Sequence, residues 1–317
     1  MTRPKIAISA CLLGEKVRFD GQGKRAPWLR NHLSKHVDWV PLCPEVGIGL
    51  SVPRDTLRLV SSSDGPRLIT TRTGEDHTSA MKSWAAVKLD ELSIEDVDGF
   101  LLTSKSPSCG LSRVRLYDQN NVPSTSQEGL FAAALKKRFP NLPAGESGQL
   151  NDPRLRQAFV ERVFAVARLR SFFASDWSWG EFVTFHASEK MLLMAHSPQK
   201  QKQLGSIVAR GRKSLRQLVA QEYRQLFLEA LAEPVTIGRH VNALQHLAGF
   251  CKDRLGTGAK RVLNDTIEGF RAGRLPLSVP LALLESHGNL YEEPWMLNQT
   301  YLVPHTKSLG LRNWTSA

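Results

Sequence analysis

Residues 97–110 read VDGFLLTSKSPSCG, an apolar run followed by a loop of small residues around one cysteine. The run VDGFLLT has the length and apolar composition of a buried strand. Directly after it, two serines, a proline and a glycine surround Cys109, and such residues mark a turn or loop. The stretch therefore predicts a cysteine held in a tight loop at the carboxyl end of a buried strand.

Other parts of the N-terminal half extend this pattern. Further short apolar runs typical of strands are KIAISACLL (5–13), VDWVPLCPEVGIGL (37–50) and LRLV (57–60). Apolar residues recur at helical spacing in SQEGLFAAALKKRF (126–139) and in RLRQAFVERVFAVARLRSFF (154–173). Strands that are separated by helical or loop segments predict an α/β domain with a mostly parallel, Rossmann-like sheet.

After about residue 170 the strand-like runs almost vanish and helical periodicity takes over. We therefore predict an all-α C-terminal helical domain. The stretch SFFASDWSWG (171–180) contains serines and a glycine and is the expected boundary. The predicted organisation is an α/β domain over residues 1–170, a linker over 171–180 and a helical domain over 181–317.

Composition limits the class of protein. The formal net charge is +12 and the pI is near 9.8, a balance that suits an anionic partner such as nucleic acid but equally a basic solubility surface. No run of about 18 apolar residues is present, and the N-terminal run is too short for a signal peptide. Four cysteines without tight pairing argue against a secreted disulfide framework. We expect a cytoplasmic protein with no membrane partner.

Three of the four cysteines share one local context. Each follows an apolar strand-like run, in IAISAC, DWVPLC and FLLTSKSPSC, and the carboxyl ends of parallel strands converge on one crevice. Three thiolates can hold zinc or an iron–sulfur cluster, two can be redox partners, or all three can be unrelated buried thiols. Structural zinc sites usually contain close cysteine pairs, which are absent here. A four-iron cluster on three cysteines would leave one iron open to substrate.

The motifs SACLLG, VRFDG, CPEVGIGL, VPRD and SPSCG follow one another in this order, and GLFAAAL and LNDPRLRQAFVERVFA come after them. This series resembles the 2-thiouracil desulfurase family over about residues 1–170. The second half resembles the YbgA-type helical domain through FHASEKMLLMAHSP, LGSIVA, HVNALQHLAGF, RLPLSVPLALL and QTYLVPHTKSLGLRN. The two-part layout is similar to the branch implicated in removing sulfur from 4-thiouridine in tRNA.

The resemblance implies roles for individual residues. It assigns a [4Fe-4S] cluster to the cysteines of the first, CPE and SPSCG motifs, which are Cys11, Cys43 and Cys109. It assigns catalytic roles to Glu45 and Ser106. Phe19 stands in VRFDG where relatives commonly have tyrosine, so no phenol oxygen is available at that position.

The chemistry of these residues agrees with that assignment. Thiocarbonyl sulfur is soft and binds an open iron well, which prepares the attached ring carbon for attack by water. Glu45 would act as base or acid, and Ser106 would donate to the ring or position the water. Simpler explanations are a helix cap for Glu45 and a turn for Ser106. Asp20, in FDG, is more often a turn residue than a catalytic helper.

Nothing in the sequence requires a nucleotide cofactor. Gly47 and Gly49 in GIG lack the third glycine and the following helix of a dinucleotide-binding fingerprint. His186 and His196 do not have metalloprotease spacing and are expected to be core or surface histidines. Cys251 lies in a helical apolar pattern and is expected to be a buried thiol.

A basic run without acidic residues spans residues 200–216 of the helical half. It is the strongest candidate for contacts with RNA phosphates, although a solvated helix face has the same composition. Its six cations are Lys200, Lys202, Arg210, Arg212, Lys213 and Arg216.

Taken together, these observations favour a [4Fe-4S]-dependent desulfidase that acts by hydrolysis, without net redox change, on thiolated uracil and most directly on 4-thiouridine in tRNA. One alternative keeps the enzyme but gives it free 2-thiouracil or thionucleosides as substrate. Another alternative is a non-catalytic RNA-binding protein that contains structural zinc.

Overall fold

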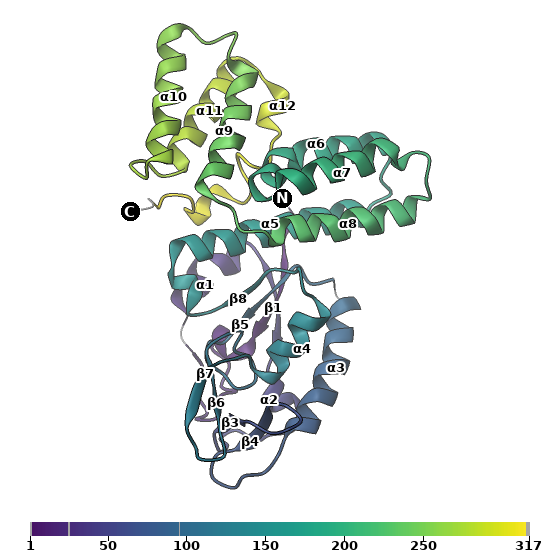
Figure 1. Cartoon of the computed structure of the whole chain (residues 1–317), viewed down its shortest axis with the longest axis vertical. Helices are drawn as coiled ribbons and strands as arrows, with labels where there is room; N and C mark the ends of the chain where they lie inside the picture. The colour runs from purple at the N-terminus through teal and green to yellow at the C-terminus, as the bar shows by residue number, and fades with distance from the viewer. Residues whose placement is uncertain (1, 25, 95, 315–317) are drawn as a thin grey trace. The chain divides into compact units, whose positions relative to one another are not determined.

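The computed structural model describes residues 2–24, 26–94 and 96–314, and the chain forms two compact units, residues 2–167 and 168–314 of those described (Figure 1). The division falls within α5 (Pro153–Ala174), so this helix contributes residues to both units. The predicted linker, residues 171–180, overlaps the end of α5 and the start of α6 (Trp179–His196).

A parallel sheet forms the centre of the first unit. Its strands are β1 (Lys5–Ser9), β2 (Asp38–Leu42), β5 (Gly99–Leu102) and β8 (Ala144–Glu146), in the order β2-β1-β5-β8. All three pairings are parallel. Ile6, Ile8 and Phe100 are completely buried, as expected of strands covered on both faces. The prediction of an α/β domain with a mostly parallel sheet is therefore confirmed.

A second, mixed sheet was not expected from the sequence. It contains β3 (Leu57–Val60), β4 (Arg67–Thr70), β6 (Val114–Tyr117) and β7 (Pro123–Gln127), in the order β4-β3-β6-β7. Only the β3–β6 pair is parallel. The sequence indicated β3 alone, because the other three strands are short and contain polar or charged residues at several positions.

Helices pack against these sheets in the first unit. The bounds of the short helices are Pro27–Asn31 (α1), Pro44–Gly47 (α2), Ala10–Leu13 (η1), Leu33–Lys35 (η2) and Gln149–Asn151 (η3). The longer α3 (Thr78–Ile94) contributes Met81, Ala85 and Leu89 to the core, and α4 (Leu130–Arg138) contributes Phe131. Met81, Ala85 and Leu89 recur at helical spacing and are buried, which explains why α3 forms. The sequence analysis did not predict this helix.

In the second unit, the described residues form helices and no strand, which confirms the prediction of an all-α domain. After α6 come α7 (Pro198–Gly211), α8 (Arg216–Ala232), α9 (Ile237–Cys251), α10 (Thr257–Arg271), α11 (Ser278–Leu290), α12 (Pro294–Leu297) and η4 (Lys307–Leu309). Ser178 and Glu181 form a capping box at the start of α6, which satisfies backbone N–H groups that the helix leaves unpaired. Across the described residues, no helix is long and apolar enough to cross a bilayer.

Candidate active site

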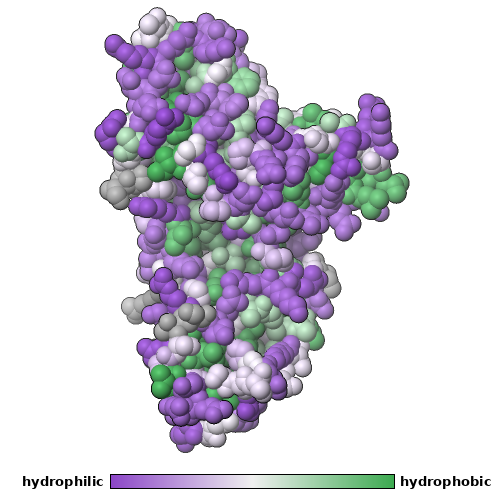
Figure 2. Space-filling model, in the orientation of Figure 1, coloured by the Kyte–Doolittle hydropathy of each residue, from purple (hydrophilic) through white to green (hydrophobic). Residues whose placement is uncertain are grey.

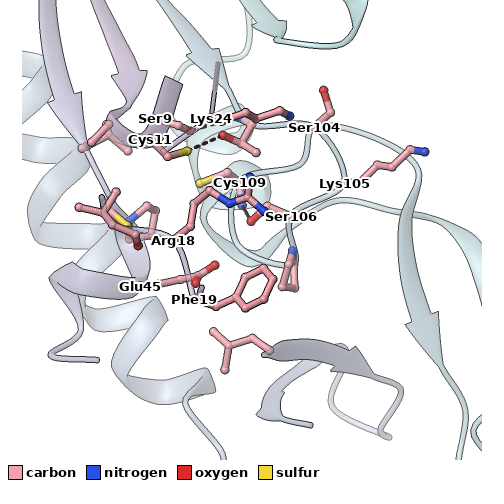
Figure 3. Close-up of a pocket in the computed structure, with 18 of the residues that line it drawn as sticks. Ser9, Cys11, Arg18, Phe19, Lys24, Glu45, Ser104, Lys105, Ser106 and Cys109 are labelled. Carbon is pink, nitrogen blue, oxygen red and sulfur yellow. Dashed lines mark hydrogen bonds between the residues drawn. The ribbon is translucent and has the colours of Figure 1, made fainter. Parts of the chain in front are cut away.

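A cavity of about 340 Å³ lies where the chain leaves β1, β2 and β5 (Figure 3). Cys11 in η1, Cys43 between β2 and α2, and Cys109 in the loop after β5 all line this cavity. Glu45 and Ser106 line it as well. Parallel pairing of the three strands puts their carboxyl ends at one edge of the sheet, so residues far apart in the sequence meet there.

Cys11 is held by a tight turn after β1. Gly14 has a φ of 96°, a left-handed conformation that glycine adopts without strain, and its N–H donates to the carbonyl of Cys11 at 3.1 Å. The Cys11 Sγ lies 3.0 Å from Thr103 Oγ1 (Figure 3). Burial raises the pKa of the Cys11 thiol, while the hydrogen bond with Thr103 and the positive charge of Lys24 act in the opposite direction.

Cys43 is the residue that precedes α2. Its carbonyl accepts the N–H of Gly47 at 2.8 Å, which closes the first helical turn. A Cβ atom on Gly47 would come within 2.3 Å of the Trp84 ring, so only glycine lets α2 lie this close to α3. Burial also raises the pKa of the Cys43 thiol, and the backbone N–H of Val46 partly offsets that effect.

The loop around Cys109 is organised by Ser106. The Ser106 Oγ accepts the N–H groups of Ser108 at 3.2 Å and of Cys109 at 3.1 Å, the pattern of a serine-stabilised turn. Burial raises the pKa of the Cys109 thiol well above its usual range, and negative charge on Glu45, Cys43 and Cys11 would raise it further. All three thiols line the same cavity.

The N-terminus of α4 holds the same loop from outside. Gly129 donates its N–H to the carbonyl of Gly110 at 2.8 Å, and Leu130 donates to the carbonyl of Pro107 at 3.0 Å. A Cβ atom on Gly129 would come within 2.5 Å of the Ser108 carbonyl. The SPSCG loop and the following EGLF stretch therefore form one packed unit that fixes Cys109.

Two side chains hold the Glu45 carboxylate in place. Arg54 donates to its Oε2 from Nε at 3.0 Å and from Nη2 at 2.6 Å, while Ser108 Oγ donates to Oε1 at 3.0 Å. Only 6% of the Arg54 side chain and 16% of the Glu45 side chain are exposed. Because no side chain caps α2, the capping explanation for Glu45 is wrong.

Arg54 also holds the segment that contributes Val17 and Phe19 to the cavity wall. Its Nη2 donates to the carbonyl of Val17 at 2.9 Å, and its backbone N–H donates to the carbonyl of Phe19 at 2.9 Å. Arg54 and Ser108 were not predicted as site residues. Both belong to quoted motifs, VPRD and SPSCG, but the residue spacing gives no indication that either contacts Glu45.

Positive charge surrounds the cavity. Arg18, Lys24 and Lys105 are among its lining residues. Lys24 Nζ donates to Ser147 Oγ at 3.2 Å, and burial lowers the pKa of Lys24. Asp20 is not among the lining residues, and its carboxylate accepts the N–H of Gln22 at 3.0 Å and pairs with Arg18 at 3.3 Å. The structure therefore gives Asp20 the role of a turn residue.

The cysteine cavity differs from a site for a single metal ion. Within residues 2–24, 26–94 and 96–314, no three His, Cys, Asp or Glu side chains form a group that could hold such an ion. The three thiols instead surround a common space, each contributed by a different loop.

The basic run of the helical unit is partly neutralised by acidic side chains from elsewhere in the sequence. Ion pairs join Lys200 to Glu233, Arg210 to Glu222 and Arg216 to Asp176. Lys202, Arg212 and Lys213 are exposed. Three of the six cations are therefore paired with acidic residues that lie outside the run, and the expected contact of the run with RNA phosphates stays a prediction. Figure 2 shows hydrophilic side chains over most of the visible face.

The histidines in this unit have structural partners. His186 Nδ1 lies 3.0 Å from the Tyr223 hydroxyl, and burial lowers the pKa of His186 to about 4. His240 Nδ1 lies 2.7 Å from the Tyr301 hydroxyl, and Nδ1 of His196 lies 2.8 Å from the carbonyl of Glu233. Cys251 is completely buried in α9, as its apolar pattern predicts.

Comparison with known proteins identifies the first unit. A family model described as 2-thiouracil desulfurase matches residues 6–147, which include all three cavity cysteines, Glu45 and Ser106. The chain belongs to the 2-thiouracil desulfurase family. A second family model, described as a protein of unknown function (DUF1722), matches residues 190–306. In this member of the 2-thiouracil desulfurase family, the unit that contains the cysteine cavity is therefore followed by a helical domain that matches a separate family model, as the sequence predicts.

Three individual proteins are similar to this chain. The uncharacterized protein YbbK of Bacillus subtilis (strain 168) is 30% identical over 110 residues, which cover 33% of this chain and 72% of that protein. The uncharacterized protein YbgA of Escherichia coli (strain K12) is 26% identical over 166 residues, covering 52% and 98%. A solved structure titled "[4Fe-4S]-dependent thiouracil desulfidase TudS" is 31% identical, covers 50% of this chain and 99% of its own, and has a TM-score of 0.40.

Proposed function

We propose that this chain is a [4Fe-4S]-dependent desulfidase that hydrolyses thiolated uracil, with 4-thiouridine in tRNA as substrate and uridine and hydrosulfide as products. The observation that supports this most strongly is the meeting of three cysteines and an ion-paired carboxylate at one cavity. The family to which the chain belongs is described by the same class of reaction.

The donor set of the cavity fits an iron–sulfur cluster. Cys11, Cys43 and Cys109 are the three thiols among its lining residues, and thiolates are the soft ligands that such clusters prefer. When bound through three thiolates, a four-iron cluster supplies one iron that can accept the soft sulfur of a thiocarbonyl and polarise the attached ring carbon.

Glu45 is the base in this proposal. A carboxylate at the cavity wall can take a proton from water as the water oxygen attacks the ring carbon that carries sulfur. The carbon–oxygen bond forms and the carbon–sulfur bond breaks. One proton of the water goes to Glu45 and the other to sulfur, which leaves as hydrosulfide, so no electrons are gained or lost. Arg54 and Ser108 keep the carboxylate in one orientation during this step.

Ser106 is a donor in this proposal. Its Oγ already accepts two backbone N–H groups, which fixes the oxygen and leaves the hydroxyl proton for another acceptor. Because Ser106 lines the cavity, that acceptor can be a ring atom of the substrate or the attacking water. The turn role and the proposed catalytic role therefore coexist in one side chain.

The cations of the cavity support a nucleotide rather than a free base. Arg18, Lys24 and Lys105 line the cavity, and phosphates flanking a thiolated residue in RNA are anionic. A base stacked within tRNA has to leave its stack before a residue in a cavity can reach it. The exposed cations Lys202, Arg212 and Lys213 are the proposed phosphate contacts of the helical unit.

Turnover of tRNA tests the proposed substrate. Anaerobically prepared protein should convert 4-thiouridine in bulk tRNA to uridine and release one hydrosulfide per residue converted, without added reductant. Mass analysis of tRNA nucleosides before and after incubation measures the conversion. Conversion of free 2-thiouracil with no change in tRNA would instead support the small-molecule alternative.

The salt dependence of tRNA binding tests the helical surface. Replacing Arg212 and Lys213 together with alanine should lower the slope of log K against log salt by about 1.5, because each phosphate contact contributes roughly 0.7 to 0.9. The matched control is Arg210→Ala, because Glu222 already compensates this charge. A slope that stays unchanged in the double variant would remove this surface from the proposed interface.

A further inference from the structure

An aromatic ring is exposed at the wall of the cysteine cavity. Phe19 lines the cavity and is 40% exposed, whereas Phe100 and Phe131 in the same unit are completely buried. Among the lining residues that the structure describes, Phe19 is the only aromatic one, so its ring is the flat apolar surface that a ligand in this cavity can contact. Figure 3 shows the ring among the side chains that surround the cavity, together with Glu45, Ser106 and Cys109.

The loop that contains Phe19 is fixed at several points. Arg54 bonds to the carbonyls of Val17 and Phe19 on either side of Arg18, and Lys24 donates its N–H to the carbonyl of Cys11 at 2.8 Å. The same Arg54 side chain holds the Glu45 carboxylate. One arginine therefore sets both the proposed base and the aromatic wall, which makes their relative position well defined.

One face of the ring already has a partner. The guanidinium carbon of Arg18 lies 5.6 Å from the ring centroid, over the ring of Phe19. Arg18 also pairs with Asp20 at 3.3 Å. A flat, apolar surface backed by a positive charge is suited to a planar heterocycle, because every nucleobase presents a π face.

We propose that Phe19 is the stacking platform that holds the pyrimidine ring of the substrate in the cavity. The ligand class is a thiolated uracil, as a base or within a nucleotide, and this assignment rests on the proposed desulfidase function. Phe19 takes no part in proton transfer, because its side chain has no titratable group. Its contribution is affinity and orientation, so its loss should affect KM more than kcat.

The test compares four forms of the holoenzyme with two substrates, free 2-thiouracil and tRNA that contains 4-thiouridine. Phe19→Ala should raise KM for both about 10- to 100-fold, the range that base–aromatic stacking contributes on alanine substitution. Phe19→Leu keeps apolar volume without a π face and should also raise KM, whereas Phe19→Tyr keeps the ring and should remain within about threefold of the wild type. Iron content and the thermal midpoint should not change.

The matched control is Val52→Ala, an exposed apolar residue outside the cavity lining, which should leave KM unchanged. A KM for Phe19→Leu equal to that of the wild type overturns the platform. Failure of the wild type to act on 4-thiouridine, with turnover of 2-thiouracil, overturns the proposed tRNA substrate instead. The Phe19 series on 2-thiouracil then still decides whether the ring is a platform.

Discussion

Cys43→Ala protein, prepared without oxygen, is expected to contain almost no iron or sulfide and to release no hydrosulfide from thiolated uracil. The reason is that each cysteine comes from a different loop, so no neighbouring thiol in the cavity can replace the lost ligand. Visible absorbance, iron analysis and hydrosulfide release measure the effect. Cys43 is the best choice of the three because it is only half-buried, whereas Cys11 and Cys109 are buried.

Cys251→Ala is the control for this experiment. Cys251 is a buried thiol in α9, outside the cavity, and its replacement should leave the iron content as in the wild type. An iron content that is unchanged in Cys43→Ala, or one that falls equally in both variants, would contradict the assignment of ligands.

Glu45→Gln is expected to lower kcat by roughly 10² to 10⁴ while the iron content stays at the wild-type level. Glutamine has the same shape but cannot take a proton from water at neutral pH. Single-turnover rates of 4-thiouridine desulfuration, with iron analysis of the same samples, separate loss of the base from loss of the cluster. Equal rates for Glu45→Gln and the wild type would remove Glu45 from the chemistry.

Two further variants control for structural effects of this change. Glu45→Gln also removes the partner of the buried Arg54 guanidinium, which costs stability, so thermal midpoints have to be compared. Asp38→Asn breaks a surface ion pair with Arg3 and should change neither activity nor iron content. Arg54→Lys keeps the positive charge but loses the pair of hydrogen bonds from Nε and Nη2 to Glu45. The kcat of Arg54→Lys should therefore lie between that of the wild type and that of Glu45→Gln.

The sequence indicates those parts of the fold that depend on local composition. The buried runs around Ile6 and Phe100 are apolar enough to be recognised as strands, and the cysteines that follow them lie at strand ends. The parallel sheet and the shared crevice follow from these patterns. The C-terminal helices follow from apolar periodicity in the same way.

Other parts depend on contacts between distant residues, which local patterns do not contain. The second sheet pairs β6 with β3 across more than fifty residues, and its polar strands have no distinct periodicity. Arg54 reaches Glu45 through the fold of the intervening loop, so its role is not visible in the spacing. Glu233 neutralises Lys200 only because α7 and α8 pack together. The α3 helix is different, since the spacing of Met81, Ala85 and Leu89 could have indicated it.

The central claim is that three separated cysteines hold a cluster at a desulfurating site. The most direct measurement is the iron and acid-labile sulfide content of wild-type protein isolated without oxygen. A [4Fe-4S] cluster predicts about four iron and about four sulfide per chain. Zinc in place of iron, or an iron-free protein that still releases hydrosulfide from thiolated uracil, would contradict it.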